Sequence, residues 1–309
     1  MDKTFDLAIA ADWEYDQDFV KLIEDAALQN GLTCHVVWPE ELTETIQKAS
    51  SGETRFRFLF DRASTSSPEF LVFQKLVADN GGEVLEPIEK VRWASDKATM
   101  HLEFIAHGLH TPYTIILPPL SSGEPFKLAP KDLSLLGIPF IIKPANTTGG
   151  SLGVVDGALS LEDVWRARQV YPTDKYLIQE KVRPREREGR RFWFRGFFIL
   201  GDVLAAWWDD QTHVYSELRS DEIERYHLQG LFPAVGKIGQ VCKLRFFSTE
   251  IVLTSDEKFL CVDYVNEPCD MRLQSRHFDG VPDAVVRRVA VRVAEHVRKS
   301  LSPSPLPVF

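Results

Sequence analysis

The most constraining stretch of this chain is residues 139–153, PFIIKPANTTGGSLG. A short apolar run ends on Lys143 and a proline, and a turn of small residues around Gly149 and Gly150 follows. A strand that ends on a cation, followed by a loop with little side-chain bulk, can close backbone N–H groups and one point charge over a phosphate. The alternative is a β-hairpin whose glycine turn supplies positive φ and whose lysine is merely solvated. Neither usual glycine-rich phosphate motif is present, since the chain lacks G-x-x-x-x-G-K-[ST] and has no G-x-G-x-x-G after its first strand.

A second lysine lies upstream, in the segment SDKATMHLEFIAHG at 95–108. Ser95 or Asp96 is typical of a helix N-cap and Gly108 of a helix end, so the segment predicts a short helix. Lys97 falls in the first turn of this helix, where the helix dipole mildly disfavours a cation. This position favours a functional use of Lys97.

Two downstream segments extend the pattern. Residues 176–182, YLIQEKV, predict a strand, and residues 246–268 predict a hairpin with Glu250 on one arm and Asp263 on the other. Mg²⁺ is usually held by one or two carboxylates together with substrate phosphates, so two acids that meet across a hairpin suffice for a site. The alternative is an exposed hairpin with ordinary surface acids. The apolar run FLCV predicts a buried second arm, in which Asp263 without a cation is costly.

The order and spacing of these segments, over about residues 90–270, resemble the ATP-grasp superfamily, in particular glutathione synthetase and the RimK-like carboxylate–amine ligases. The resemblance implies ATP and Mg²⁺ as ligands, with ATP between two subdomains. The nucleotide-binding residues that it implies are Lys97, Lys143, Thr147, Thr148, Gly149, Gly150, Ser151, Gln179, Glu180, Lys181 and Val182. It further implies a ribose-binding acid, matched by Glu188 or Glu186, and a metal site of Glu250, Asp263 and Asn266.

The two metal-site residues of the second arm have an unusual spacing. Asp263 and Asn266 are three apart, whereas side chains that share one face of a strand are two apart. Either a β-bulge brings both side chains to one face, or Asn266 and the adjacent Glu267 take different roles.

Three arginines are candidates for the reaction itself. Arg195 lies within the predicted strand FWFRGFFIL, where a buried or semi-buried guanidinium needs an anionic partner. We expect Arg195 and Arg272 to stabilise a developing oxyanion, and Arg219 and Arg272 to grip an acidic substrate. The alternative, for Arg219 and Arg272, is an ordinary solvated position.

Residues 1–90 alternate apolar strand patterns with amphipathic helix patterns, which predicts a β-α-β unit with a parallel sheet. Asp12, Trp13 and Glu14, at the carboxyl end of the first strand, are either ligand-facing or a solvated loop. The expected fold class is α/β, with an α+β grasp domain. We therefore expect a Rossmann-like pre-ATP-grasp domain at 1–90, an ATP-grasp domain of two subdomains at 91–300, and a disordered tail at 301–309.

Net charge and the number and spacing of cysteines limit the classes of partner and the compartment that we expect. The 309 residues carry 36 basic and 45 acidic side chains, a net charge of −9, which argues against nucleic acid and anionic membrane surfaces. No apolar stretch reaches the roughly 20 residues of a membrane span. Four cysteines without C-x-x-C spacing, and no charged-then-apolar leader, favour a reduced, cytoplasmic protein. The expected partners are small-molecule carboxylate and amine substrates, and a homodimer is left open.

Such a site predicts a ligase that converts a carboxylate to an acyl phosphate, from which an amine displaces phosphate to form an amide. Two alternatives share the ATP site. One is an ATP-grasp small-molecule kinase similar to the inositol-polyphosphate kinases, and the other is a non-catalytic ATP-binding module. The products distinguish them, because a kinase leaves the phosphate on its acceptor and a binding module releases nothing.

Overall fold

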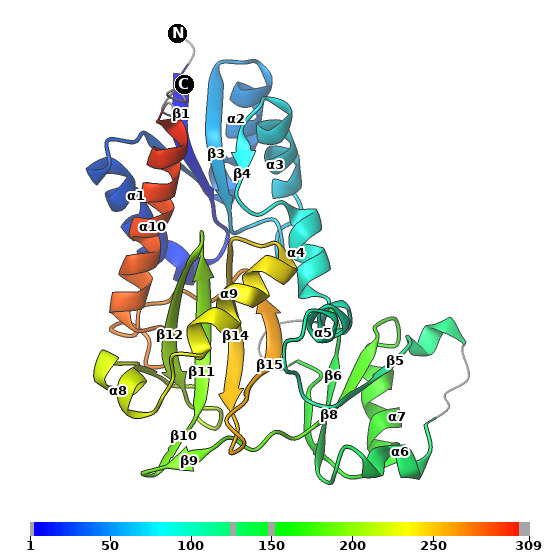
Figure 1. Ribbon diagram of the computed structural model, residues 1–309. Helices are drawn as coiled ribbons and strands as arrows, with labels where there is room; N and C mark the ends of the chain where they lie inside the picture. Colours follow the sequence, from blue (N-terminus) through cyan, green and yellow to red (C-terminus); the bar gives the residue numbers. More distant parts are fainter. Residues whose placement is uncertain (1–2, 124–127, 148–151, 303–309) are drawn as a thin grey trace, which may run out of the picture.

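The computed structural model describes residues 3–123, 128–147 and 152–302 (Figure 1). In these ranges the chain forms a four-stranded parallel sheet, a five-stranded antiparallel sheet, a four-stranded antiparallel sheet and a two-stranded ribbon. The mixed α/β class predicted from the sequence is confirmed.

The parallel sheet forms the first lobe, in the order β2-β1-β3-β4, as the alternation of strand and helix patterns predicted. Leu7 and Ile9 pack on one face with α1, whereas Ala8 and Ala10 pack on the other with α2 and α3. Burial on both faces explains why β1 reads as a continuous apolar run. The elements are β1 (Lys3–Ala10), η1 (Glu14–Asp16), α1 (Gln17–Gln29), β2 (Cys34–Val37), α2 (Pro39–Ser50), β3 (Thr54–Asp61), α3 (Phe70–Asp79) and β4 (Glu83–Val84).

The five-stranded sheet has the order β13-β12-β11-β14-β15. Even-numbered β11 residues such as Phe194 pack in the core formed with α9, whereas Phe197 and Ile199 pack in the core formed with α1 and α10. Strand alternation therefore turns Arg195 toward the face opposite α9. The elements are α4 (Ile88–Ser95), α5 (Lys97–Ala106), β11 (Trp193–Ile199), β12 (Asp202–Trp208), β13 (Tyr215–Glu217), α8 (Ser220–Arg225), α9 (Leu231–Cys242), β14 (Phe246–Leu253), β15 (Phe259–Asn266) and α10 (Asp283–Leu301).

The C-terminal helix α10 joins the first lobe to this sheet. Its stripe of Val286, Val289, Val293 and Val297 shares one hydrophobic core with β1, α1 and β11. This core joins residues from before and after position 90, so it marks no domain boundary there. The boundaries at 90 and 300 stay predictions. Residues 303–309 of the predicted tail lie outside the described residues.

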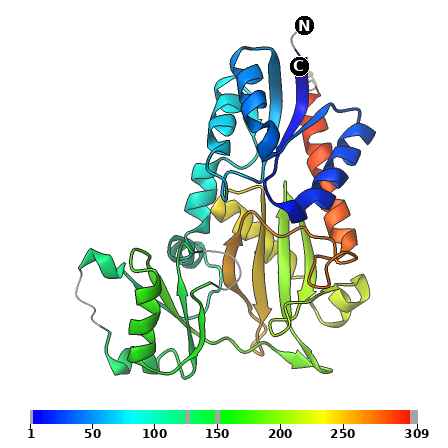
Figure 2. The ribbon, with the colours of Figure 1, turned by 180° about the vertical axis from the view of Figure 1, so that it is seen from behind.

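The small sheet has the order β5-β8-β6-β7, and in both views it stands beside the β15 edge of the five-stranded sheet (Figure 1 and Figure 2). Ile142 and Ile178 pack in the core formed with α7, so alternation turns Lys143 and Gln179 to the opposite face. The remaining elements are β5 (Thr114–Leu117), η2 (Leu120–Ser122), α6 (Pro130–Ser134), β6 (Phe140–Pro144), β7 (Val155–Ala158), α7 (Leu161–Val170), β8 (Tyr176–Glu180), β9 (Glu186–Arg187) and β10 (Arg190–Arg191).

Candidate active site

A row of charged residues crosses three neighbouring strands of the five-stranded sheet. Arg195 on β11 is the cross-strand partner of Glu250 on β14, which in turn is the partner of Asp263 on β15. Arg195 Nη2 lies 2.8 Å from Glu250 Oε1, and Trp193 Nε1 donates to Glu250 Oε2 at 3.2 Å. Both carboxylate oxygens of Glu250 are therefore held in fixed directions.

Asp263 lies half-buried at the end of this row. Burial alone raises the pKa of this carboxyl, but the positive charges of Lys97, Lys143 and Arg195 outweigh burial and hold the pKa below its usual range. Asp263 is thus a carboxylate surrounded by cations. The charges of these three residues and of Asp263 and Glu250 sum to plus one, which suits a polyanionic ligand.

A bulge brings Asn266 to the same place. Ser248 pairs with Asn266 and Glu250 pairs with Asp263, so two steps along β14 match three along β15. Asn266 Nδ2 consequently donates to Asp263 Oδ2 at 3.0 Å. Of the two alternatives left by the sequence, the structure has the bulge.

The two lysines come from separate elements. Lys143, near the end of β6, is 7% exposed, and its Nζ donates to the backbone oxygen of Val262 at 2.7 Å. Burial, and then the charge of Lys97, lower the pKa of Lys143, although Asp263 and Glu250 act in the opposite direction. Lys97 begins α5, and its backbone N–H donates to Ala145 O at 3.0 Å. Segments far apart in sequence thus bring both lysines to the carboxylates.

The segment 179–182 ends β8 and continues beyond it. Gln179 Nε2 donates to Thr114 Oγ1 at 2.9 Å and to the Tyr264 hydroxyl at 3.0 Å, and that hydroxyl also pairs with His101 Nδ1 at 2.8 Å. Burial lowers the pKa of His101 to about 4, so its ring is neutral near pH 7. Gln179 therefore stabilises the contact between the small sheet and β15.

The next three residues line a hollow. Glu180 Oε1 accepts from the backbone N–H of Tyr113 at 2.7 Å, and Lys181 Nζ lies 2.8 Å from Asp156. Glu180, Lys181 and Val182 line, together with Leu260, a hollow of about 390 Å³. Both the Glu180 and the Lys181 side chains thus have protein partners, and a nucleotide contact through the backbone of this segment stays a prediction.

Of the predicted phosphate loop, the structure describes only the ends. The backbone N–H of Thr147 donates to Asp174 Oδ2 at 3.0 Å. Thr148, Gly149, Gly150 and Ser151 lie outside the described residues, so their assignment stays a prediction.

Three other predicted residues have different surroundings. Glu188, the ribose candidate, accepts from Arg225 Nη2 at 2.7 Å and from the Tyr226 hydroxyl at 2.9 Å, at the end of α8. The alternative match, Glu186, pairs with Arg191 at 2.9 Å. Arg219 is the N-cap residue of α8, 63% exposed, with Asp221 as its nearest anion. Among the described residues, no hydrogen bond or ion pair joins Glu188 or Arg219 to the row of charges, and their predicted roles stay predictions.

Arg272 is held by two carboxylates. Its guanidinium donates to Asp270 at 2.7 Å and to Asp279 at 3.0 Å, and it lies 5.7 Å from the Trp13 ring of the first lobe. Arg272 thereby stabilises the loop after β15. Its Nε, Nη1 and Nη2 atoms all donate to Asp270 or Asp279. Its predicted roles, in gripping substrate and in stabilising an oxyanion, stay predictions.

Sequence reasoning missed Trp193, Tyr264 and Asp174. Trp193 could have been found, because it lies two residues before Arg195 and strand alternation puts both on one face. Tyr264 and Asp174 carry no local signal, since their partners lie far away in sequence.

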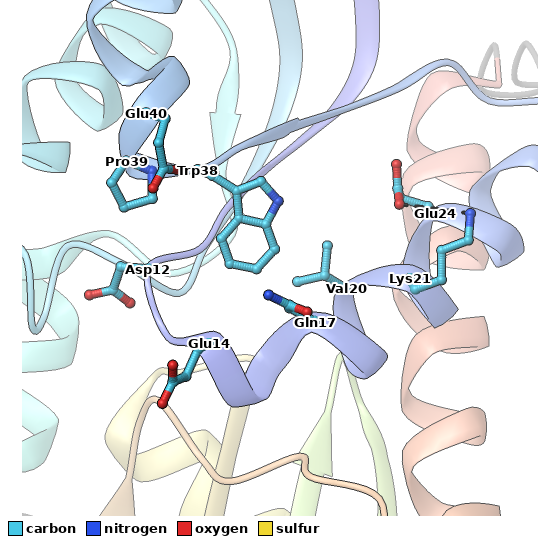
Figure 3. Close-up of a pocket in the computed structure, with 9 residues that line it drawn as sticks. All are labelled: Asp12, Glu14, Gln17, Val20, Lys21, Glu24, Trp38, Pro39 and Glu40. Atoms are coloured by element: carbon cyan, nitrogen blue, oxygen red, sulfur yellow. Dashed lines mark ion pairs between the residues drawn. The ribbon is translucent and has the colours of Figure 1, made fainter.

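The first lobe has its own hollow, of about 530 Å³, at the carboxyl ends of β1 and β2 (Figure 3). Asp12 and Glu14 line it, together with Trp38, whose ring lies between Asp12 and Val20 of α1. Asp12 accepts from the hydroxyls of Ser66 and Ser67 at 2.6 and 2.8 Å. The predicted position of Asp12 and Glu14 at a strand end is confirmed, but a ligand role for them stays a prediction.

The donor set at Glu250 and Asp263 fits magnesium. In the described ranges no three His, Cys, Asp or Glu residues are grouped as a metal site. Mg²⁺, however, needs only one or two carboxylates when phosphates and water complete its octahedron. Glu250, Asp263 and the Asn266 amide supply oxygen donors of this kind on adjoining strands.

Comparisons with known proteins place the fold. Neither the protein-family models nor the curated proteins gave a match. Among solved structures, an ATP-grasp RimK domain protein from Sphaerobacter thermophilus matches with TM-score 0.62 and 18% identity, over 94% of this chain and 98% of that one. D-alanine–D-alanine ligase from Bacillus anthracis, complexed with ATP, matches with TM-score 0.59 and 14% identity, over 96% and 99%. The ligase PsnB, complexed with a minimal precursor, Mg and ADP, matches with TM-score 0.59 and 14% identity, over 94% and 97%.

These likenesses span nearly the whole chain and concern the fold. Within the described ranges, no helix combines the length and the apolar character needed to cross a membrane.

Proposed function

Starting from the ATP-grasp fold, we propose that this protein is an ATP- and Mg²⁺-dependent ligase that activates a small-molecule carboxylate as an acyl phosphate for attack by an amine. The observation that carries the proposal is the meeting of Lys97, Lys143 and Arg195 with Glu250 and Asp263. Cations from three elements surround two carboxylates that suit a metal, which is the arrangement that a bound nucleotide triphosphate requires.

ATP lies between the small sheet and β14–β15 in this proposal. Lys97 and Lys143 bind its phosphates, and the backbone of residues 179–182 binds adenine. Mg²⁺, held by Glu250, Asp263 and Asn266, neutralises phosphate charge. That two of the structural neighbours are complexed with ATP, or with Mg and ADP, supports this choice of ligands.

Arg195 is the residue proposed to act on the reacting groups. Its Nη2 is paired with Glu250, whereas its buried Nε has no partner among the described residues. It lies 4.7 Å from the Trp208 ring, which limits its freedom to move. A guanidinium fixed in this way stabilises negative charge as it develops on the transferred phosphoryl group and on the attacked carbonyl. The protein thereby orients the reactants and neutralises charge, and supplies no covalent nucleophile.

Hydroxylamine provides a general test, because it replaces the unknown amine and traps an acyl phosphate as a hydroxamate. With ATP, Mg²⁺ and a panel of small carboxylic acids, we expect phosphate release that depends on the acid, with hydroxamate in equal amount. Glu250→Gln should lose this turnover and keep most of its affinity for AMPPNP, since adenine and lysine contacts remain. ADP formation with phosphate retained on a hydroxyl acceptor would indicate the kinase instead. Full activity of Glu250→Gln would remove the row of charges from the mechanism.

A further inference from the structure

The turn between α7 and β8 contains a buried acid, Asp174, whose carboxylate accepts hydrogen bonds from residues outside both of these elements. Asp174 is 7% exposed, and its carboxylate binds the segment that follows β6, 27 and 28 residues earlier in the chain. It accepts from the Asn146 backbone N–H at 2.9 Å, from Asn146 Nδ2 at 2.7 Å and from the Thr147 backbone N–H at 3.0 Å. The backbone oxygen of Lys175 adds a bond from Ala145 N at 2.9 Å. One turn therefore fixes three consecutive residues where the chain leaves Lys143 and Pro144.

The neighbouring residue of the same turn reaches the other lysine. Lys175 Nζ forms an ion pair with Asp96. Asp96 is the N-cap of α5, and accepts from Ala98 N at 3.0 Å and Thr99 N at 3.1 Å. Since Lys97 is the first residue of this helix, Lys175 fixes its position through the cap. Lys97 N also donates to Ala145 O at 3.0 Å, which ties the two segments together.

The burial of Asp174 needs an explanation. A buried carboxylate is costly, and the partners described for Asp174 are hydrogen-bond donors of Asn146 and Thr147. An ordinary turn could be capped by a short neutral side chain at lower cost. The donors that Asp174 binds belong to Asn146 and Thr147, three and four residues after Lys143. This position points to the placement of Lys143 as the reason for the arrangement.

We propose that Asp174 and Lys175 are positioning residues for the phosphate-binding lysines, Lys143 and Lys97. Asp174 acts through Asn146 and Thr147, and Lys175 acts through Asp96. Neither residue touches the nucleotide. The inference rests on the proposed function, because it assigns a purpose to the turn only if Lys97 and Lys143 bind phosphates.

The test compares Asp174→Ala, Asp174→Asn and Lys175→Met with a matched control in the same subdomain. The control is Asp163→Ala, since Asp163 also accepts from two backbone N–H groups, those of Leu159 and Ser160, at 2.9 and 3.0 Å. Calorimetric titration with AMPPNP and Mg²⁺ measures affinity, and thermal unfolding measures stability. We expect Asp174→Ala to raise the Kd about tenfold, the equivalent of one charge-assisted hydrogen bond. Asp174→Asn, which keeps an oxygen acceptor, should lie between this variant and the wild type.

Asp163→Ala should lower the unfolding temperature and leave the Kd unchanged, which separates positioning from general stability. In a Lys143→Met background, Asp174→Ala should add little, because both changes act on the same contact. If the wild type binds AMPPNP and Asp174→Ala binds as tightly as Asp163→Ala, the positioning role is wrong while the proposed function stands. If the wild type does not bind AMPPNP with Mg²⁺, the proposed function and this inference both fall.

Discussion

Lys143→Met should separate the stability of this protein from its function. In the folded protein the pKa of Lys143 is below its ordinary value of 10.5, because of burial and the nearby charge of Lys97. The unfolded chain therefore binds this proton more tightly than the folded one. The resulting penalty on folding is fully present below the lowered pKa of the folded protein and is relieved as the pH rises from there toward 10.5. Removing the charge removes the penalty.

The expected size follows from the contacts. Replacing a buried ion pair by apolar groups of similar volume is neutral or stabilising by about 1–4 kcal/mol. We apply this range to Lys143→Met because Lys97 and Arg195 stay beside Asp263, so the substitution leaves no carboxylate without a cation. Losing the hydrogen bond from Nζ to Val262 O offsets about 1 kcal/mol of this gain. At about 2 °C per kcal/mol for a chain of this length, the ligand-free variant should unfold between 0 and about 6 °C above the wild type.

With bound nucleotide, the wild type should unfold at a higher temperature than Lys143→Met. AMPPNP at 100 times its Kd adds about 2.7 kcal/mol to the wild type, or about 5 °C. A variant that binds about 100-fold more weakly, as the loss of one charge contact predicts, gains only about 0.4 kcal/mol at the same concentration. Thermal unfolding with and without AMPPNP and Mg²⁺ measures both effects. Lys48→Met serves as control, since Lys48 is 44% exposed and pairs only with Glu44 among its described contacts.

A large loss of stability in ligand-free Lys143→Met, with the nucleotide shift intact, would refute the reasoning. Lys143 would then be a structural residue of β6.

Two further predictions concern the junction between the first lobe and the five-stranded sheet. Burial raises the pKa of Glu86 to about 7, so the folded protein binds this proton more tightly than the unfolded chain. The free energy of unfolding should therefore fall by about 3 kcal/mol as the pH rises from 5 to 8. In urea titrations, Glu86→Gln should remove this share of the pH dependence, and an unchanged profile would contradict the assignment. Arg62→Met should cost about 3–5 kcal/mol by leaving Asp16, 2.6 Å away and buried, without its cation. The exposed pair of Arg57 and Asp6 gives the control, with less than about 1 kcal/mol expected for Arg57→Met.

The elements that could be predicted are those whose pattern is local. β1, β2 and β3 read as apolar runs between amphipathic helices, and β14 and β15 as a hairpin with an acid on each arm. The expectation of an ATP-grasp fold rested on a resemblance in the order and spacing of segments over about residues 90–270, and the solved structures bear the fold out. The structure brings together Lys97, Lys143, Glu250 and Asp263, which the sequence had singled out, while their roles stay predictions.

The helix α9 shows what local patterns miss. Gly236 and Gly239 interrupt its helical pattern, yet a Cβ at Gly239 would lie 2.8 Å from the Phe198 ring, and one at Gly196 on β11 would lie 2.4 Å from Val235. The glycines therefore serve close packing of helix on sheet, which only the tertiary structure reveals.

The same limit applies to the candidate site. Arg219 and Arg272 were chosen by residue type, but their partners, Asp221 in one case and Asp270 with Asp279 in the other, were decided by the fold. Asp174 went unnoticed for the same reason, because its partners follow the neighbouring strand β6, 27 and 28 residues earlier in the chain. The sequence shows that an arginine or aspartate in a loop is charged. Its role depends on which opposite charge or hydrogen-bond donor lies beside it in the folded protein.

The most direct test of the account is a crystal of this protein grown with AMPPNP and Mn²⁺, which replaces Mg²⁺ and gives an anomalous signal. We predict an anomalous peak in contact with carboxylate oxygens of both Glu250 and Asp263, with the triphosphate bound to the Nζ atoms of Lys97 and Lys143. Nucleotide bound elsewhere, or a bound triphosphate with no peak at Glu250 and Asp263, would contradict the assignment of this site.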